Sequence, residues 1–288
     1  GGVTPGWLTQ KLVASDIAAD EARALLDRAP LDLRVNTLKT TRSALQLPEA
    51  ASPTAAPNGL RLAPGTAVER WDQFGRGLIE VQDTGSQIAC IAVGAQPGET
   101  VIDLCAGGGG KTLALAAMME NRGRLIATDT DRQRLSRLAP RAARAGAGMI
   151  ETRLLDPGRE FEALGDLAGA ANAVLVDAPC SGTGTWRRNP EARWRLTAAA
   201  LEGLERSQAR LLDIAARLVR PGGRVVYVVC SLLDEEGTGQ FDAFLARHPE
   251  FAPLSLALPL GNARGQGRRL SPFQDGTDGF FIACATSA

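Results

Sequence analysis

The chain is poor in the residues that most metal and histidine-based centres need. Among its 288 residues there is one histidine, His248, which argues against a catalytic or metal centre built on imidazole. The five cysteines stand at irregular spacing without a CxxC pair. This spacing indicates neither a disulfide framework nor a zinc site, so we expect no bound metal.

Targeting and membrane signals are lacking as well. The sequence has no signal peptide and no apolar run of about 20 residues that could span a bilayer. We therefore expect a cytoplasmic protein that does not associate with membranes. The chain opens with Gly1 instead of Met, which is compatible with the removal of an upstream segment.

An excess of either charge is also absent, because 32 Lys and Arg residues balance 32 Asp and Glu residues. This balance argues against a protein that coats nucleic acid through net charge alone, but it leaves a local basic groove open. Hydrophobic residues make up 44% of the chain, enough for a sizeable core and too many for wholesale disorder. The length fits one large domain together with a small one.

The first part of the chain predicts a few short elements. Apolar positions recur at helical spacing over residues 16–29, and Ser15 and Asp16 are candidates to cap that helix. Residues 31–39 alternate apolar and polar side chains, as a half-buried strand does. Residues 47–64 are rich in Pro and Ala and contain Asn-Gly, a composition typical of loops and turns.

These elements indicate a small α+β module over residues 1–78, and a larger catalytic domain is expected over 79–288. In the larger part predicted strands alternate with helices, among them an Arg-rich helix over 131–145 and a long helix over 197–219. Strand–helix alternation predicts an α/β fold with a doubly wound parallel sheet. Ligands of such sheets lie beyond the carboxyl ends of the strands.

The stretch TVIDLCAGGGGKT (100–112) combines a short apolar strand, the glycines Gly107–Gly110 and a helix start, a pattern typical of nucleotide-cofactor loops. A phosphate-binding P-loop would need a glycine where Cys105 stands, and a dinucleotide fingerprint would need one at Thr112. S-adenosylmethionine carries no phosphate, so neither of these missing glycines argues against it. Asp129, at the end of the next predicted strand, could bind its ribose hydroxyls.

Three carboxylates and two thiols follow predicted strands and should meet at one edge of the sheet: Asp129, Asp156, Asp177, Cys180 and Cys230. A thiolate beside a methyl donor can add to C6 of a pyrimidine, which makes C5 nucleophilic, and later elimination restores the ring. Asp177 could donate a proton near N3 if burial raises its pKa. These residues alone do not decide which thiol attacks.

Several segments together resemble the motifs of the Nol1/Nop2/Sun family of RNA cytosine-5 methyltransferases. The resemblance covers residues 31–285 and is carried by LRVNTLK, QDTGSQ, DLCAGGGGKT, DAPCSGTGT, YVVCSLLDEE and DGFFIA. The segment RRNPEARWR is similar to the one that follows the Pro-Cys motif in the bacterial Sun/RsmB-like branch, which acts on ribosomal RNA. The resemblance implies a Rossmann-like class I fold that uses S-adenosylmethionine.

The resemblance also implies roles for single residues. Cys230 would be the nucleophile, and Cys180 would assist release of the methylated RNA. Asp177 remains the third catalytic candidate on the chemical argument above. The residues implied to bind S-adenosylmethionine are Cys105, Ala106, Gly107, Gly108, Gly109, Gly110, Lys111, Asp129, Asp156 and Asp177.

Two basic segments are candidates for RNA contact. Arg187, Arg188, Arg193 and Trp194 interleave charge with an aromatic ring, which suits phosphates and an unstacked base. The structural alternative is a helix cap with solvated arginines and a tryptophan in the core. The glycine-rich, basic residues 261–270 could form a mobile loop that closes on RNA. We expect the protein to act as a monomer on ribosomal RNA.

Two departures from the family pattern keep other functions open. The glycine loop lacks the usual proline, and Val228 and Val229 replace the Ser-Thr that normally precedes the nucleophile. The same reaction on transfer RNA is the alternative within enzymes. An inactive RNA-binding factor in ribosome assembly is the alternative outside them, and the altered glycine loop is its support.

Overall fold

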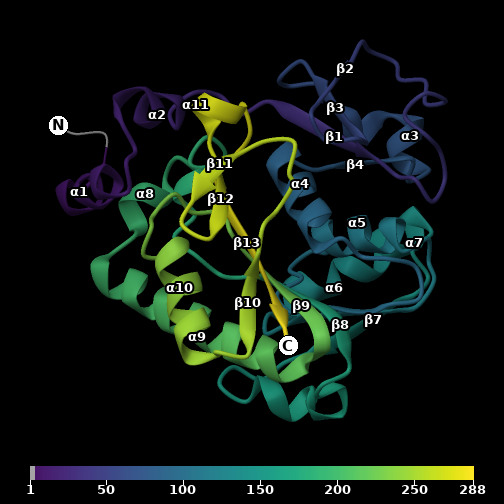
Figure 1. Cartoon of the computed structure of the whole chain (residues 1–288). Helices are drawn as coiled ribbons and strands as arrows, with labels where there is room; N and C mark the ends of the chain where they lie inside the picture. The colour runs from purple at the N-terminus through teal and green to yellow at the C-terminus, as the bar shows by residue number, and fades with distance from the viewer. Residues whose placement is uncertain (1–3) are drawn as a thin grey trace.

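The computed structural model describes residues 4–288, and its main feature within that range is one large mixed sheet (Figure 1). The strands follow the order β11-β12-β13-β9-β8-β5-β6-β7, and β10 pairs with β13. Their bounds are β5 Thr100–Asp103, β6 Arg124–Asp129, β7 Ile150–Leu154, β8 Ala171–Asp177, β9 Val219–Val229, β10 Phe251–Leu254, β11 Asn262–Arg264, β12 Gly267–Leu270 and β13 Phe280–Ser287.

The centre of this sheet is parallel and its β13 side is antiparallel. β5 pairs in parallel with both β6 and β8, and the parallel region extends to β7 and β9. β13 runs antiparallel to β9. The chain moves outward in one direction from β5 to β7 and in the other from β8 to β9, so the switch point lies between β5 and β8. A ligand crevice is expected there, at the carboxyl ends of these strands.

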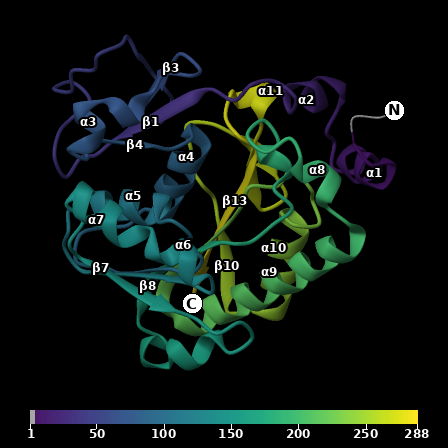
Figure 2. The same ribbon diagram turned by 180° about the vertical axis from the view of Figure 1, so that it is seen from behind.

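Helices cover both faces of the sheet, as Figures 1 and 2 show from opposite sides. On one face lie α4 (Thr84–Val93), α5 (Gly110–Met118), α6 (Arg132–Ser136) and α7 (Leu138–Ala145); on the other lie α9 (Ala198–Leu218) and α10 (Thr238–Arg247). Because side chains alternate along a strand, β8 sends Ala173 and Leu175 into the first layer and Val174 and Val176 into the second. The doubly wound prediction is confirmed.

Several helix starts follow local capping signals. Asp83 caps α4 by accepting from the Gly85 N–H, and Thr197 caps α9 by accepting from Ala200. The long helix expected over 197–219 is therefore confirmed. The single helix expected over 131–145 is wrong, since it is divided between α6 and α7; Pro140 lacks the N–H that would continue the hydrogen bonding of α6.

The N-terminal part forms a separate small antiparallel sheet with the order β2-β3-β1-β4 among the described residues. Its strands are β1 Leu31–Val35, β2 Ser52–Pro53, β3 Gly59–Leu62 and β4 Ile79–Val81, with α3 (Asp72–Gly75) beside them. The loop expected over 47–64 therefore contains two strands, β2 and β3. β3 pairs with β1 and buries Leu60 and Leu62. β4 extends the small sheet beyond the boundary expected at residue 78.

The first helices do not belong to this small sheet. α1 (Gly6–Ala14) instead buries Leu8 and Leu12 in one cluster with Trp186 and Leu201 of the larger domain. Leu25, at the end of α2 (Ala19–Ala24), belongs to the same cluster. The helix expected over 16–29 is thus too long, and neither Ser15 nor Asp16 caps it. Asp16 has φ 58°, which lies in the left-handed region and ends the preceding helix turn.

The basic segment 261–270 is a hairpin, not a mobile loop. Its strands β11 and β12 pair with each other, and β12 pairs with β13 at the sheet edge. Arg264 bonds Asp16 and Asp234, which holds the hairpin against the N-terminal helices. The remaining α-helices of the described residues are α8 (Ala192–Arg195) and α11 (Pro272–Asp275). Within residues 4–288, no helix combines the length and apolarity that crossing a bilayer requires.

Candidate active site

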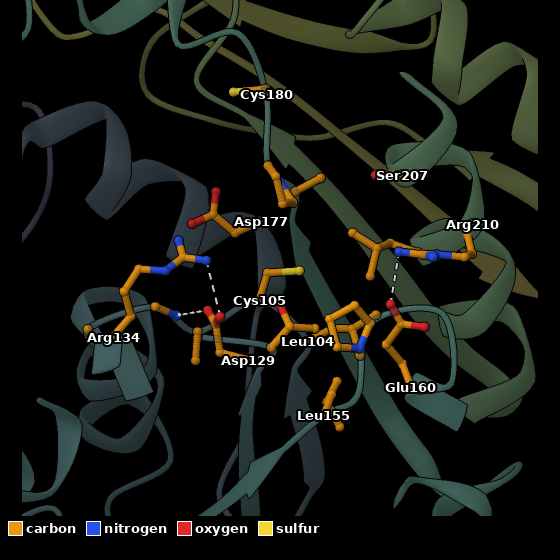
Figure 3. A pocket seen from close by; sticks show the side chains of 18 of the residues that line it. Leu104, Cys105, Asp129, Arg134, Leu155, Glu160, Asp177, Cys180, Ser207 and Arg210 are labelled. Carbon is orange, nitrogen blue, oxygen red and sulfur yellow. Dashed lines mark hydrogen bonds and ion pairs between the residues drawn. The ribbon is translucent and has the colours of Figure 1, made fainter. Parts of the chain in front are cut away.

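A cavity of about 700 Å³ opens at the switch point between β5 and β8. Figure 3 shows Leu155 and Glu160 at its lower end, Asp129 and Arg134 on one side, and Cys180 at its upper end. It is lined by residues that come from the ends of several strands and from α9: Leu104, Cys105, Ala106, Gly107, Gly108, Asp129, Thr130, Arg134, Leu155, Pro157, Glu160, Asp177, Ala178, Pro179, Cys180, Ser207, Arg210, Leu211 and Cys230.

The glycine loop brings the backbone to the edge of this cavity. Gly107 and Gly109 have φ values of 55° and 83°, which a residue with a side chain adopts only with strain. A Cβ on Gly109 would also lie 2.1 Å from Leu138 Cδ1, so glycine is required there on two grounds. The loop divides its contacts, because Ala106 to Gly108 line the large cavity and Gly110 and Lys111 line a second one.

Asp129 holds the glycine loop as well as facing the cavity. One carboxylate oxygen accepts from the Gly107 N–H at 2.9 Å. The other accepts from the Asp131 N–H at 2.7 Å and from Arg134 at 3.1 Å. Only 4% of Asp129 is exposed, and the exposed part lies in the cavity wall. The carboxylate therefore fixes the loop and presents its remaining acceptor position to a ligand.

Asp177 forms an ion pair with Lys111, whose Nζ donates to it at 2.7 Å. Asp177 is therefore not the isolated buried carboxyl group that a proton-donor role on its own would need. Burial lowers the pKa of Lys111, but the charge of Asp177 and its hydrogen bond raise that pKa by more, so the net shift is upward. The pair therefore keeps a proton on Lys111, beside Asp177, through neutral pH.

The two thiols that follow β8 and β9 meet at the upper end of the cavity. Cys180 Sγ and Cys230 Sγ are 3.3 Å apart, within the reach of a sulfur hydrogen bond. The pKa of the Cys180 thiol is raised well above its usual value by that bond, by burial and by the negative charge of Glu236. Cys180 is thus held as a protonated thiol at neutral pH.

A second cavity, of about 360 Å³, is also lined by Cys230. It is lined by residues of the glycine loop, β4, α4, α7 and the start of β13: Val81, Gln82, Asp83, Ser86, Ala106, Gly110, Lys111, Arg141, Asp177, Thr185, Cys230, Asp278 and Phe280. Asp177 and Cys230 line both cavities, whereas Cys180 lines the first cavity and not the second. Two ligands could therefore meet at Cys230, one from each cavity.

One predicted site residue is misplaced. Asp156 is exposed and does not appear in the lining of either described cavity, whereas its neighbours Leu155 and Pro157 do line the large one. Successive side chains of an extended chain point to opposite sides, and Leu155 takes the inward position. The role in cofactor binding predicted for Asp156 therefore finds no support in the geometry.

The sequence analysis missed the residues that α6 and α9 contribute. Arg134 bonds Asp129, and Arg210 forms an ion pair with the buried Glu160 at 2.9 Å on the opposite side of the cavity (Figure 3). Ser207 and Leu211 line the same wall. α9 reads as an ordinary amphipathic helix, so its pattern carries no signal for a ligand site.

The candidate RNA residues divide into buried and exposed ones. Trp186 is buried, and Arg187 pairs with Asp278 at 3.2 Å with only 6% of its side chain exposed. The predicted phosphate contact of Arg187 is therefore wrong, because a guanidinium buried on a carboxylate is not available to RNA. Arg188 also bonds Asp278 but keeps 34% of its side chain exposed. Trp194 is 51% exposed, and the partly exposed Arg193 lies 6.0 Å from its ring.

The other cysteines and potential metal ligands add no further centre. Cys90 and Cys284 are buried, and burial raises their thiol pKa values to about 12 and about 11. Cys105 lines the large cavity, and burial likewise raises its pKa. Over residues 4–288, no group of three or more His, Cys, Asp and Glu side chains is arranged to hold a metal ion.

Comparisons with known proteins agree with this geometry. A family model described as 16S rRNA methyltransferase RsmB/F matches residues 90–285. A ribosomal RNA small subunit methyltransferase B of Sodalis glossinidius is 34% identical over 287 residues, which cover 97% of this chain and 64% of the relative. A probable enzyme of the same name from Synechocystis is 37% identical over 268 residues, covering 88% and 59%.

A solved structure of a methyltransferase homologue from Pyrococcus horikoshii has a TM-score of 0.80 and is 26% identical, and the match covers 99% of this chain and all of that one. The sheet and its covering helices are therefore those of Rossmann-like S-adenosylmethionine-dependent methyltransferases. The chain spans about 60% of the length of the two relatives from Sodalis and Synechocystis.

Proposed function

Because this chain belongs to the RsmB/F family of 16S rRNA methyltransferases, we propose that it methylates C5 of a cytosine in small-subunit ribosomal RNA. The observation that carries the proposal is a pair of thiols 3.3 Å apart, one of which, Cys230, lines both cavities. One cavity has the features of a site for S-adenosylmethionine, and the other can take a base. A thiol at the junction is placed for covalent activation of that base.

The large cavity fits S-adenosylmethionine on three counts. Asp129 keeps an acceptor position for a ribose hydroxyl, and the apolar side chains of Leu104, Leu155 and Leu211 offer a surface for the adenine ring. The glycine loop from Cys105 leaves the backbone accessible at Gly107, where a Cβ would meet no atom within 4 Å. When bound, S-adenosylmethionine supplies the electrophilic methyl group that C5 of the activated ring accepts.

Cys230 is the better placed of the two nucleophile candidates. It lines both cavities, and Lys111 lines the second cavity together with it. Cys180 is held protonated by Cys230, burial and Glu236, which suits a group that handles protons or assists release. The resemblance to the Nol1/Nop2/Sun family leads to the same assignment.

The residues of the second cavity support the steps on the base. The Cys230 thiolate forms a bond to C6 of cytosine while the Lys111–Asp177 pair delivers a proton toward N3. The ring then carries its excess electron density at C5, where the new methyl group is attached. Transfer of the C5 proton to a base, cleavage of the sulfur–C6 bond and return of the N3 proton to the Lys111–Asp177 pair restore the neutral aromatic ring and the thiolate.

Two variants with ordinary and modified RNA test this proposal. Cys230→Ser should abolish methylation and form no covalent adduct with RNA carrying 5-fluorocytosine, whose fluorine blocks the elimination step. Cys180→Ser should accumulate a covalent protein–RNA complex even with ordinary cytosine. Cys284→Ala, which changes a buried thiol outside both cavities, serves as the matched control. Denaturing gels with labelled RNA provide the measurement.

The outcomes of this experiment are distinct. If the Cys230 variant forms the adduct and the Cys180 variant does not, the roles of the thiols are reversed. If methyl groups pass to transfer RNA but not to small-subunit ribosomal RNA, the chemistry stands and the substrate assignment fails. Absence of S-adenosylmethionine binding in calorimetry would instead favour an inactive RNA-binding factor.

Exposed residues of the segment after Cys180 are our candidates for RNA contact. Replacing Arg193 and Trp194 by Ala should weaken RNA binding, since an arginine–phosphate contact and a stacked ring are both lost. The slope of log affinity against log salt should fall by about one for the lost arginine. The exposed Arg206 of α9 provides a control replacement of one positive charge. An unchanged slope would assign this segment a structural role.

A further inference from the structure

A buried hydrogen-bonded cluster lies directly beneath the two thiols. We call Ser181, Thr183, Gln208, Ser231 and Glu236 the Glu236 cluster; none of these residues is more than 8% exposed. Ser181 and Ser231 immediately follow Cys180 and Cys230 in the chain. The cluster therefore joins the turn after β8 to the turn after β9.

The carboxylate of Glu236 is the centre of this cluster. Its Oε1 accepts from the Ser181 N–H at 2.8 Å and from Gln208 Nε2 at 3.0 Å. Its Oε2 accepts from the Ser231 hydroxyl at 2.5 Å and from the Ser181 hydroxyl. A fully buried carboxylate is costly unless such donors surround it, so its presence specifies the geometry of the groups that bond it.

Further bonds fix the two turns to each other. The Thr183 hydroxyl accepts from the Leu232 N–H at 2.9 Å and lies 3.1 Å from the Ser231 hydroxyl. The Gly184 N–H donates to the Cys230 carbonyl at 3.1 Å. Every one of these bonds joins one turn to the other, and none passes through the ligand cavities. The distance between the two thiols is therefore fixed by hydrogen bonds that lie outside the ligand cavities.

We propose that Glu236 is the positioning residue that holds the thiols of Cys180 and Cys230 at the separation that the methyl transfer needs. The proposal rests on the proposed methyl transfer, in which one thiol attacks and the other assists release. Glu236 does not line either ligand cavity. It acts through Ser181 and Ser231, and its charge also contributes to keeping Cys180 protonated.

Replacement by alanine and by glutamine separates geometry from charge. In Glu236→Ala the Ser181 N–H and the Gln208 amide lose a buried acceptor, and the two turns can move apart. In Glu236→Gln the amide oxygen can still accept from both, and the serine hydroxyls can reverse to accept from the amide nitrogen. The glutamine variant should therefore retain most of the geometry without the charge.

The spacing of the thiols can be measured without methyl transfer. Phenylarsine oxide bonds two neighbouring thiols, replacing its oxygen by two sulfur atoms and releasing one water. The wild type should bind one equivalent, and Cys180→Ser or Cys230→Ser should lose it. Glu236→Ala should bind it at least about tenfold more weakly because the effective concentration of the second thiol falls. Glu236→Gln should bind nearly as well as the wild type.

Turnover provides the second measurement. In Glu236→Ala, kcat for RNA methylation should fall by about 100-fold, since small displacements of reacting groups have effects of this size. Affinity for S-adenosylmethionine should stay close to wild type, and Glu236→Gln should recover most of kcat. The control is Glu21→Gln, which alters another buried glutamate that accepts from a serine hydroxyl, far from the thiols.

The results that overturn the proposal are specific. Unchanged arsenical affinity in Glu236→Ala, or a fall of equal size in Glu21→Gln, would assign Glu236 to general stability alone. If Glu236→Ala does not fold, Ser231→Ala takes its place and should show a smaller loss in both measurements; no loss in either overturns the proposal. If the wild type methylates no RNA, the proposed function fails, while the arsenical measurement still decides the role of Glu236.

Discussion

Replacement of Asp129 by alanine is the most direct perturbation of the proposed cofactor site. A carboxylate offers about four acceptor positions. The protein uses three of them, for the N–H groups of Gly107 and Asp131 and for Arg134. Roughly one position is therefore left for a ribose hydroxyl, and the variant removes one charge-assisted hydrogen bond from the complex.

That bond sets the size of the effect. Hydrogen bonds to a charged group contribute about 1.5–3 kcal/mol. Asp129→Ala should therefore weaken S-adenosylmethionine binding by roughly 10- to 150-fold. The loss of the Gly107 anchor acts in the same direction, because the glycine loop must then be ordered when the ligand binds. Calorimetric titration with S-adenosylmethionine measures the change.

Asp131→Ala is the matched control for this experiment. Asp131 follows β6 two residues later, is exposed, and caps α6 through the Gln133 and Arg134 N–H groups. Its backbone N–H, which bonds Asp129, is retained in alanine, so affinity should stay near the wild-type value. Equal affinity in the Asp129 variant and the wild type would refute the reasoning, and another acid would have to bind the ribose.

Two further predictions concern stability. Arg187→Ala should lower the free energy of unfolding by about 1–3 kcal/mol, because buried Asp278 loses one partner but keeps Arg188. Urea denaturation measures this change. An effect on RNA binding without a change in stability would contradict the prediction. Burial raises the pKa of Asp103 from 3.8 to about 7, so the folded state retains a proton that the unfolded state releases. The contribution of Asp103 to the free energy of unfolding is complete below pH 4. It falls by about 1.4 kcal/mol per pH unit as the pH rises to 7. Asp103→Asn should remove that slope, and equal slopes in both proteins would disprove the shift.

The sequence by itself determined the central sheet and the placement of most site residues. Apolar strands followed by helical periodicity are local signals, and a parallel sheet brings the carboxyl ends of its strands to one edge. For this reason Asp129, Asp177, Cys180 and Cys230 could be assigned to one crevice from the sequence alone. The glycine loop could be placed there too, since it follows a strand and precedes a helix.

Other features depended on contacts between distant segments. The strand β3 lies in a stretch whose composition favours turns, and it exists because β1 offers it a partner. The inward position belongs to Leu155 and not to Asp156, and only the register of the folded chain decides between two adjacent residues.

The same holds for charges and polar networks. A sequence shows that Arg187 is basic, but the carboxylate that buries it, Asp278, lies 91 residues away. The Glu236 cluster likewise draws its members from three separate segments, and no local pattern reveals that one carboxylate bonds Ser181, Gln208 and Ser231. Secondary structure follows from neighbours in the chain, whereas burial and hydrogen-bond satisfaction are properties of the packed interior, which only the tertiary structure defines.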